Sequence, residues 1–277
     1  MRIAVTGAGG GLGRALLERA LEGHEVAAFT HADLPVEDRH AVMQRLVPAE
    51  PALILHCAAM TAVDACEEDP DRAYLINALG TRNVALAARE AGAVLVAVST
   101  DYVFDGEKGA PYHEFDAPSP LSVYGASKLA GEREAALAPE HLIVRTSWVF
   151  GAGSDFVSGA VRRLAAGEEV GGLVDLHGTP TYVGHLADRL VPLARSGARG
   201  VVHLGGPERM TFLDLLARAK EVGSLPGTLV EQKSGDLGRP ARRPADASLT
   251  SLVLESTGVA PMPPIEEALQ EVVDGLD

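Results

Sequence analysis

Short β-branched runs alternate with longer helical patterns through the first half of this 277-residue chain. Five runs have the length and composition of strands: residues 2–6, 25–29, 52–56, 93–99 and 141–145. Four helical stretches lie between them: residues 12–22, 36–46, 72–91 and 123–137. Parallel strands need crossover connections and these helices supply them. The pattern therefore predicts an α/β fold in which helices cover both faces of a parallel sheet.

The second half of the chain is less regular. Turn signals crowd three stretches: residues 151–155, 167–178 and 234–244. A further strand is expected at 200–204, followed by a helix at 211–222 and an acidic amphipathic helix within 261–273. We expect residues 147–277 to complete the sheet and to add a smaller, interleaved lobe over its carboxyl edge.

A glycine-rich turn follows the first strand directly. Gly7, Gly10 and Gly13 have a G-x-x-G-x-x-G spacing. In such a turn the first glycine permits a tight bend, the second lets the backbone approach a pyrophosphate, and the third lets the helix pack on the strand. The helix N-terminus then favours the negative charge. We interpret residues 1–146 as a Rossmann-type, doubly wound NAD(P)-binding core. The predicted contacts of this turn are Gly7, Gly10, Gly11, Leu12 and Gly13.

The end of the second strand indicates which dinucleotide is used. An acid at this point would bind the ribose 2′-hydroxyl of NAD and repel the additional phosphate of NADP. Here the strand ends in Phe29-Thr30-His31, and the first acid is Asp33. Thr30 and His31 are able to donate hydrogen bonds to a 2′-phosphate. We therefore expect NADPH as the cofactor, with NADH tolerated.

Three polar residues form a candidate catalytic group. Tyr124 and Lys128 are four residues apart in a helical stretch, which puts them on one face, one turn apart. Reduction of a ketone requires a hydride on carbon and a proton on oxygen, and a tyrosine can supply that proton when a nearby ammonium lowers its pKa. Thr100 follows the fourth strand, at the sheet edge where α/β proteins bind ligands. Its hydroxyl is expected to orient the carbonyl.

Several longer blocks are similar to those of one family. They are AAMTAVD (58–64), STDYVFDG (99–106), PLSVYGASKLAGE (120–132), RTSWVFG (145–151), GTPT (178–181) and RPARRP (239–244). With these blocks in this order, the whole chain resembles the dTDP-4-dehydrorhamnose reductase family of extended short-chain dehydrogenases. The resemblance implies reduction of the 4-keto group of dTDP-4-dehydrorhamnose to dTDP-L-rhamnose, with a hydride from NAD(P)H and a proton from a tyrosine.

The resemblance also implies roles for individual residues. The catalytic residues would be Thr100, Tyr124 and Lys128. Besides the glycine turn, the cofactor would be held by Thr30, Asp33, Leu34, Cys57, Ala58, Ala59, Thr61, Tyr124 and Lys128. The nucleotide-sugar substrate would contact Thr100, Asp101, Tyr102, Val103, Trp148, Arg242 and Arg243. Asn77 would brace the active site.

Some positions depart from the family pattern. His56-Cys57 stands where the family has an asparagine, and Met60 replaces an aromatic residue or histidine. Arg14-Ala15 stands where some members carry an acid of an intersubunit metal site, and we therefore predict no metal site here.

Two other functions fit the same blocks. One is a reductase or epimerase of another nucleotide-linked keto sugar, and the other is a regulatory role like that of the methionine adenosyltransferase β subunit. Sugar dehydratases of the superfamily carry adjacent Asp and Glu after the threonine. Tyr102 follows Asp101 here, which favours simple reduction.

Composition limits the partners of the chain. A net charge of −14 disfavours binding to nucleic acid or to anionic lipid. No apolar run reaches the ~18 residues of a membrane span. The two cysteines cannot form a disulfide framework, and the N-terminus lacks the long apolar region of a signal peptide. We expect a cytoplasmic protein with a small-molecule substrate. A homodimer fits the sequence, which leaves the oligomeric state open.

Overall fold

A parallel sheet of six strands forms the centre of the computed structural model, which describes residues 1–276. The strand order is β10-β5-β4-β3-β1-β2. The strands are β1 (Arg2–Thr6), β2 (Glu25–Phe29), β3 (Leu53–His56), β4 (Val94–Thr100), β5 (His141–Thr146) and β10 (Gly200–His203). The order reverses direction at β1 and β3, and this reversal places a ligand crevice at the carboxyl ends of these strands. The predicted α/β fold is confirmed.

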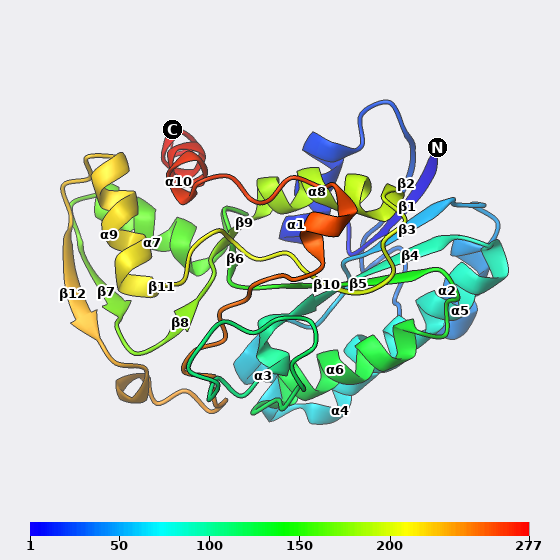
Figure 1. The fold of residues 1–277 in the computed structure, drawn as a ribbon, viewed down its shortest axis with the longest axis horizontal. Helices are drawn as coiled ribbons and strands as arrows, with labels where there is room; N and C mark the ends of the chain where they lie inside the picture. The colour runs from blue at the N-terminus through cyan, green and yellow to red at the C-terminus, as the bar shows by residue number, and fades with distance from the viewer. Residues whose placement is uncertain (277) are drawn as a thin grey trace.

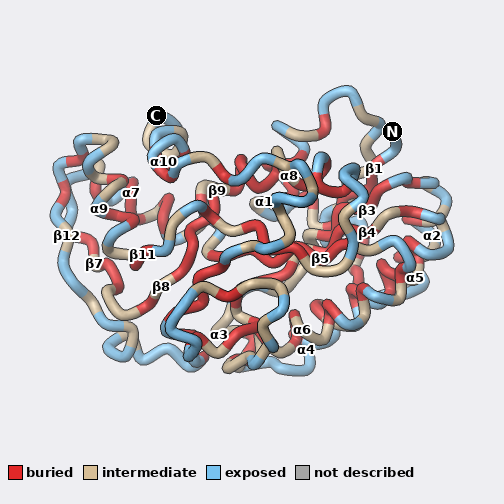
Figure 2. Tube along the Cα trace, in the orientation of Figure 1, coloured by how far each residue is buried: buried red, intermediate tan, exposed pale blue. Residues whose placement is uncertain are grey.

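Helices cover both faces of the sheet (Figure 1). On one face lie α1 (Gly11–Ala15), its π-helical continuation η1 (Leu16–Ala20) and α8 (Val183–Arg195). On the other lie α2 (Arg39–Leu46), α5 (Thr81–Ala91) and α6 (Val123–Ala135). Each layer has its own apolar core, with Leu16 and Leu186 in the first and Val42 and Val84 in the second. Figure 2 shows the buried chain concentrated along the sheet.

Two helices of the core begin at places that the sequence pattern did not predict. The helix expected from residue 36 begins at Arg39, because the Asp38 carboxylate accepts hydrogen bonds from the backbone N–H groups of His40 and Ala41. The stretch expected at 72–91 begins earlier, in α4 (Pro70–Tyr74). It continues through a π-helical turn, η2 (Leu75–Gly80), into α5. Such widened turns are frequent at functional sites, and Asn77 lies in this one.

A smaller lobe packs beside the carboxyl edge of the sheet. It contains α7 (Phe156–Ala165), β7 (Glu169–Leu173), α9 (Phe212–Val222), β12 (Thr228–Gln232) and α10 (Ile265–Asp274). Figure 1 shows these elements grouped together, away from the six-stranded sheet. Their core includes Val161, Leu216 and Leu269, which are all fully buried. The division of the chain at residue 146 stays a prediction.

The prediction of turns throughout residues 167–178 was wrong, since β7 occupies part of this stretch and pairs in parallel with β12. The glycines of β7 do not form a turn but allow neighbouring segments to pack closely against the strand. A Cβ atom on Gly172 would lie 2.7 Å from Cα of Leu213, at the start of α9. Glycine in a strand often has this meaning.

Short elements join the lobe to the sheet. Strand β6 (Val149–Phe150) forms a parallel pair with β9 (Thr181–Tyr182). Strand β8 (His177–Gly178) forms an antiparallel pair with β11 (Met210–Thr211). The remaining short helices are α3 (Val63–Glu68), η3 (Asp101–Val103), η4 (Ser234–Leu237) and η5 (Leu254–Thr257). Among residues 1–276, no helix combines the length and apolar character needed to cross a membrane.

Candidate active site

A cavity of about 570 Å³ lies between the carboxyl edge of the sheet and the smaller lobe. Most of the residues predicted for the site line it together. They are Gly7, Gly10, Gly11, Leu12, Gly13, Cys57, Ala59, Thr61, Thr100, Asp101, Tyr102, Tyr124, Lys128 and Trp148. These residues come from loops after β1, β3, β4 and β5 and from α6, so the fold brings together groups that are far apart in the sequence.

The glycine turn has the geometry of a cradle. Gly7 has a φ of +70°, and a Cβ atom there would lie 2.6 Å from the backbone nitrogen of Ala58. A Cβ atom on Gly13 would lie 2.6 Å from Cα of Ala8. Side chains at either position would push apart the turn, the first helix and the loop after β3. The start of the first helix lines the cavity, and the N-terminus of a helix, with its unpaired N–H groups, favours a bound pyrophosphate.

The predicted contacts at the end of β2 lie outside this cavity. The Asp33 carboxylate accepts hydrogen bonds from the Thr30 backbone N–H at 3.0 Å and from the Thr30 hydroxyl at 2.6 Å, and these bonds lower its pKa. Leu34 is buried in the core against α2 and α5. Thr30 adjoins the glycine turn, because a Cβ atom on Gly9 would lie 3.6 Å from its methyl carbon. Their roles in cofactor binding stay predictions.

Thr100, Tyr124 and Lys128 all line the cavity. The Lys128 ammonium donates a 2.7 Å hydrogen bond to the backbone oxygen of Val98, and burial lowers its pKa to about 8. Burial raises the pKa of Tyr124, an effect that a hydrogen bond with Thr100 partly offsets. The expected lowering of the Tyr124 pKa by the Lys128 ammonium does not appear in the protein alone. The phenol therefore holds its proton at neutral pH, the state that a proton donor needs.

Several contacts fix helix α6, which carries Tyr124 and Lys128. Ser122 caps its first turn, accepting a hydrogen bond from Gly125. Farther along, Glu132 and Arg145 form a buried ion pair with a 2.7 Å distance between Oε2 and Nη2. The Ser99 hydroxyl donates a 2.5 Å hydrogen bond to Glu132 Oε1. Since Ser99 precedes Thr100 on β4, the hydrogen bond between Ser99 and Glu132 ties the helix to the strand that carries Thr100.

Asn77 connects the same helix to the loop after β3. It is buried, and its amide nitrogen donates to the backbone oxygen of Met60 at 3.1 Å and to the Ser127 hydroxyl at 2.9 Å. Its amide oxygen accepts from the backbone N–H of Met60 at 2.8 Å. Ser127 directly precedes Lys128. These bonds give Asn77 the geometry of the brace that the family resemblance implied.

Asp101 connects three segments around the cavity. Its carboxylate accepts hydrogen bonds from the hydroxyl of Thr100 at 2.9 Å and from that of Ser147 at 2.7 Å. Ser147 in turn accepts from the backbone N–H of Thr179, in the loop before β9. Burial raises the pKa of Asp101 to about 6, although both hydroxyl bonds act in the opposite direction. A buried carboxyl group thus holds the Thr100 hydroxyl in place.

This pKa gives a test by stability. Between about pH 6 and pH 4 the folded chain keeps a proton on Asp101 that the unfolded chain releases, because the ordinary pKa is 3.8. The stability that this group contributes therefore rises as the pH falls through that window. Chemical unfolding of wild type and Asp101→Asn should show the variant's relative stability falling by on the order of 2 kcal/mol from about pH 7 to about pH 4. The difference in stability between wild type and variant removes the contributions of other carboxylates. Asp64 is an example, since its lowered pKa makes its contribution to stability fall as the pH falls in both proteins. A difference independent of pH would contradict the assignment.

Aromatic side chains form the wall of the cavity on the lobe side. Trp148 stacks on Phe212 with ring centroids 3.7 Å apart, and Phe156 meets Phe212 edge-on at 5.4 Å. Trp148 has a φ of +44°, which is uncommon for a residue with a side chain and indicates a constrained position. A Cβ atom on Gly178 would lie 2.5 Å from its ring. Phe156 and Phe212 were not predicted. The only signal in the sequence was that both begin helices of the lobe.

The remaining predicted residues lie around the cavity and do not line it. Val103 is buried against Phe104 in a separate small core. Ala58 packs behind the glycine turn. Arg243 forms a two-point ion pair with Asp64, with nitrogen–oxygen distances of 2.8 and 3.2 Å. Burial raises the pKa of Tyr102 to about 12, and the charge of Arg243 acts against this rise, so the guanidinium lies close to a residue that lines the cavity.

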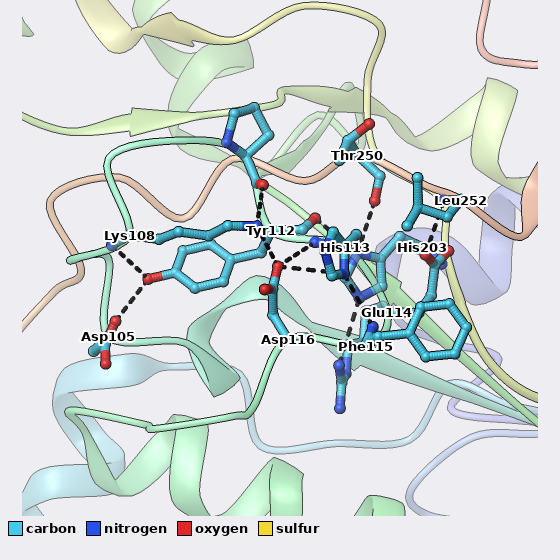
Figure 3. A network of polar contacts seen from close by, with 12 residues as sticks. Asp105, Lys108, Tyr112, His113, Glu114, Phe115, Asp116, His203, Thr250 and Leu252 are labelled. Atoms are coloured by element: carbon cyan, nitrogen blue, oxygen red, sulfur yellow. Dashed lines mark hydrogen bonds and ion pairs between the residues drawn. The ribbon is translucent and has the colours of Figure 1, made fainter.

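A polar network away from the cavity holds the segment that follows Arg243 (Figure 3). Glu114 accepts hydrogen bonds from the backbone N–H groups of His203 at 2.9 Å and Leu252 at 3.0 Å. Tyr112 exchanges backbone bonds with the strap of residues 248–250, and its ring stacks on Phe104. None of the residues labelled in Figure 3 lines the cavity. The network therefore anchors the strap of residues 248–250, which follows the arginines in the chain.

Comparison with known proteins finds one family over the full length of the chain. A model of the RmlD substrate binding domain matches residues 1–277. The dTDP-4-dehydrorhamnose reductase of Mycolicibacterium smegmatis is 38% identical over 281 residues, covering 98% of this chain and 85% of the relative. That of Streptomyces griseus is also 38% identical and covers 98% of this chain and 92% of the relative.

A solved structure is similar in both fold and sequence. The dTDP-4-dehydrorhamnose reductase of Bacillus anthracis, crystallised in complex with NADP, superposes with a TM-score of 0.94 at 34% identity and covers 99% of each chain. The UDP-glucose 4-epimerase of Thermus thermophilus, in complex with NAD, has a TM-score of 0.85 at 25% identity, covering 100% of this chain and 99% of the epimerase.

Proposed function

Because the chain belongs to the RmlD substrate binding domain family, we propose that it reduces the 4-keto group of dTDP-4-dehydrorhamnose with NADPH, giving dTDP-L-rhamnose. One observation carries the proposal. Thr100, Tyr124 and Lys128 share a single cavity with the glycine turn, so a carbonyl, a proton donor and a dinucleotide fit side by side. Asp101 followed by Tyr102 supports reduction over dehydration, which requires an additional acid and base.

The glycine cradle fits a dinucleotide, since Gly7 and Gly13 let the turn, the first helix and the loop after β3 pack closely, and the turn and the first residues of the helix line the cavity. The residues that would hold the cofactor are Gly7, Gly10, Gly11, Leu12, Gly13, Cys57, Ala59, Thr61 and Lys128. When bound, NADPH supplies the hydride of the reaction. The aromatic residues Trp148, Phe156 and Phe212 give the cavity an apolar wall beside the catalytic residues.

The side chains of the protein supply the proton and the orientation. Tyr124 donates its phenolic proton to the carbonyl oxygen, and burial keeps that proton on the phenol beforehand by raising its pKa. Lys128 stabilises the resulting phenolate by its positive charge, since opposite charges favour the ionised form. The single proton of the Thr100 hydroxyl goes to Asp101 in the protein alone, and this bond keeps the hydroxyl in place. When substrate binds, the hydroxyl turns that proton to the carbonyl oxygen and directs it toward Tyr124.

The substrate carries a nucleoside diphosphate, which requires positive charge in an acidic protein. Arg243 is positioned by Asp64, which also accepts a hydrogen bond from the Ala241 backbone N–H at 3.1 Å. A guanidinium held in this way is ready to bind a phosphate with little further ordering. We propose that Arg243 binds the diphosphate and that the Trp148 face contacts the sugar.

Substitution Arg243→Met is expected to raise KM for the nucleotide sugar about 10-fold or more, because a charge-assisted hydrogen bond contributes roughly 1.5–3 kcal/mol. The dissociation constant for NADPH should stay within about 2-fold of wild type. The matched control is Arg163→Met on the surface of α7, where the arginine pairs with Glu168 far from the cavity, and KM should not change. Equal effects of the two substitutions on KM would remove Arg243 from the substrate site.

The function itself is tested by a direct assay. Purified protein is mixed with NADPH and enzymatically generated dTDP-4-dehydrorhamnose, and loss of the nicotinamide absorbance is recorded, with the UDP-linked sugar in parallel. We expect rapid oxidation with the dTDP-linked sugar and formation of dTDP-L-rhamnose. If NADPH binds but neither sugar is reduced, the proposed substrate is wrong.

A further inference from the structure

Thr146 is a residue of the cavity to which neither the sequence nor the family comparison assigned a role. It ends β5, it is 5% exposed, and it lines the cavity. Its hydroxyl oxygen has no hydrogen-bond partner within residues 1–276. Buried hydroxyl groups are normally paired, and each exception calls for an explanation such as a ligand.

The neighbouring hydroxyl groups show that this one is different. Thr146 lies directly opposite Thr100 in the register of β4 and β5. The Thr100 hydroxyl donates to Asp101 and accepts from the Tyr102 backbone N–H, while the Ser147 hydroxyl donates to Asp101 and accepts from Thr179. In the protein alone, both hydroxyl groups therefore have partners. Of these three adjacent groups, only the Thr146 hydroxyl has none within residues 1–276.

The position of Thr146 in the sheet indicates which part of a ligand it meets. The strand order runs β2-β1-β3-β4-β5, and the glycine cradle for the pyrophosphate lies after β1. A dinucleotide centred there has its adenosine half toward β2 and its other half toward β4 and β5. The group at that end is the nicotinamide ring, and its carboxamide is the part able to form hydrogen bonds with a hydroxyl.

We propose that the Thr146 hydroxyl binds the carboxamide of the nicotinamide ring and so sets the position of the ring beside Thr100 and Tyr124. The proposal rests on the proposed function, in which the dinucleotide is NADPH. Valine has nearly the shape of threonine and would satisfy the packing of β5, whose Leu142 and Val144 point to the same face. The polar oxygen therefore serves binding and not folding.

Binding measurements on the full chain test this directly. Isothermal titration of wild type, Thr146→Val and Thr146→Ser uses two probes: NADPH, and 2′-phospho-ADP-ribose, which is the same dinucleotide without the nicotinamide ring. We expect Thr146→Val to weaken NADPH about 10-fold, equivalent to about 1.4 kcal/mol, and to leave the ring-less probe within about 2-fold. Thr146→Ser, which keeps the hydroxyl, should bind NADPH like wild type.

Equal weakening of both probes, or no weakening of NADPH, would overturn the assignment. The test also separates this proposal from the proposed function. If the expected binding pattern appears but dTDP-4-dehydrorhamnose is not reduced, the Thr146 assignment stands and the proposed function fails. If wild type does not bind NADPH, both fail.

Thermal unfolding without ligand gives an independent reading. Removing an unpaired buried hydroxyl should leave the melting temperature of Thr146→Val equal to or above that of wild type. The matched control is Thr181→Val. Thr181 is also buried, but its hydroxyl donates to the Thr179 backbone oxygen and accepts from the Gly206 N–H, both at 3.0 Å. The control should melt about 2–4 °C lower. A similar loss in Thr146→Val would show that its hydroxyl is used by the fold, which would overturn the proposal.

Discussion

Substitution of Tyr124 by phenylalanine is expected to lower kcat by at least ~100-fold, the lower end of the effect of losing a general acid. Phenylalanine keeps the ring that meets Tyr102 edge-on, with centroids 5.5 Å apart, and removes only the hydroxyl group. Steady-state oxidation of NADPH with dTDP-4-dehydrorhamnose measures the effect.

The matched control for this substitution is Tyr112→Phe. The Tyr112 hydroxyl donates to Asp105 at 2.6 Å in the network of Figure 3, outside the cavity, so its loss should leave kcat unchanged. Binding of NADPH to Tyr124→Phe should also stay within about 10-fold of wild type, since the glycine turn is untouched. Near-normal turnover of Tyr124→Phe would show that another group donates the proton.

Substitution Glu132→Ala is expected to lower the free energy of unfolding by about 3–5 kcal/mol, because it leaves the buried Arg145 guanidinium without its partner. Both side chains are less than 7% exposed, and Arg145 also packs against the ring of Phe104. Urea unfolding followed by circular dichroism measures the loss. The damage should reach the site as well, since Glu132 also accepts the Ser99 hydrogen bond that ties α6 to the strand that ends in Thr100.

Two controls separate a buried charge from the loss of a side chain. The double variant Glu132→Met, Arg145→Met removes both charges and should be more stable than Glu132→Ala. Glu168→Ala breaks a surface ion pair whose members are both more than half exposed, and it should change stability by less than about 1 kcal/mol. If Glu132→Ala were no worse than Glu168→Ala, the pair would not hold the helix.

Local patterns in the sequence predicted the sheet well. All five strands of the first half lie within one residue of their predicted bounds, because each is a short, mostly apolar run between clear breaks. The helices were located, but the starts of two were not, since caps such as Asp38 act through a few hydrogen bonds that leave no periodic signal. The widened turn around Asn77 is a similar case.

The second half of the chain was predicted less well than the first, because part of its order comes from contacts between distant segments. Strand β7 carries two glycines that permit close packing of α9, and in isolation such glycines indicate a turn. Helix α8 was not predicted, and it contains Pro192, a residue that normally ends a helix. Its apolar face is nevertheless buried on the sheet, and this packing outweighs the local preference.

For the site, the order of motifs along the chain was informative and their detailed contacts were not. The glycine turn, Thr100, Tyr124 and Lys128 were predicted from residue type and position, and they share one cavity. Phe156 and Phe212 were missed because an aromatic residue at the start of a helix has no specific signal. The ion pair between Asp64 and Arg243 joins residues far apart in sequence. The roles of Arg242, the homodimer and the cytoplasmic location stay predictions.

Transfer of deuterium from cofactor to sugar tests the central claim most directly. The protein is incubated with dTDP-4-dehydrorhamnose and NADPH carrying deuterium at the transferred position, and the product is analysed by mass spectrometry and NMR. We predict dTDP-L-rhamnose with one deuterium at C4 and one oxidised cofactor for each sugar reduced. An isomerised sugar without deuterium and without net oxidation of cofactor would indicate an epimerase and would contradict the account.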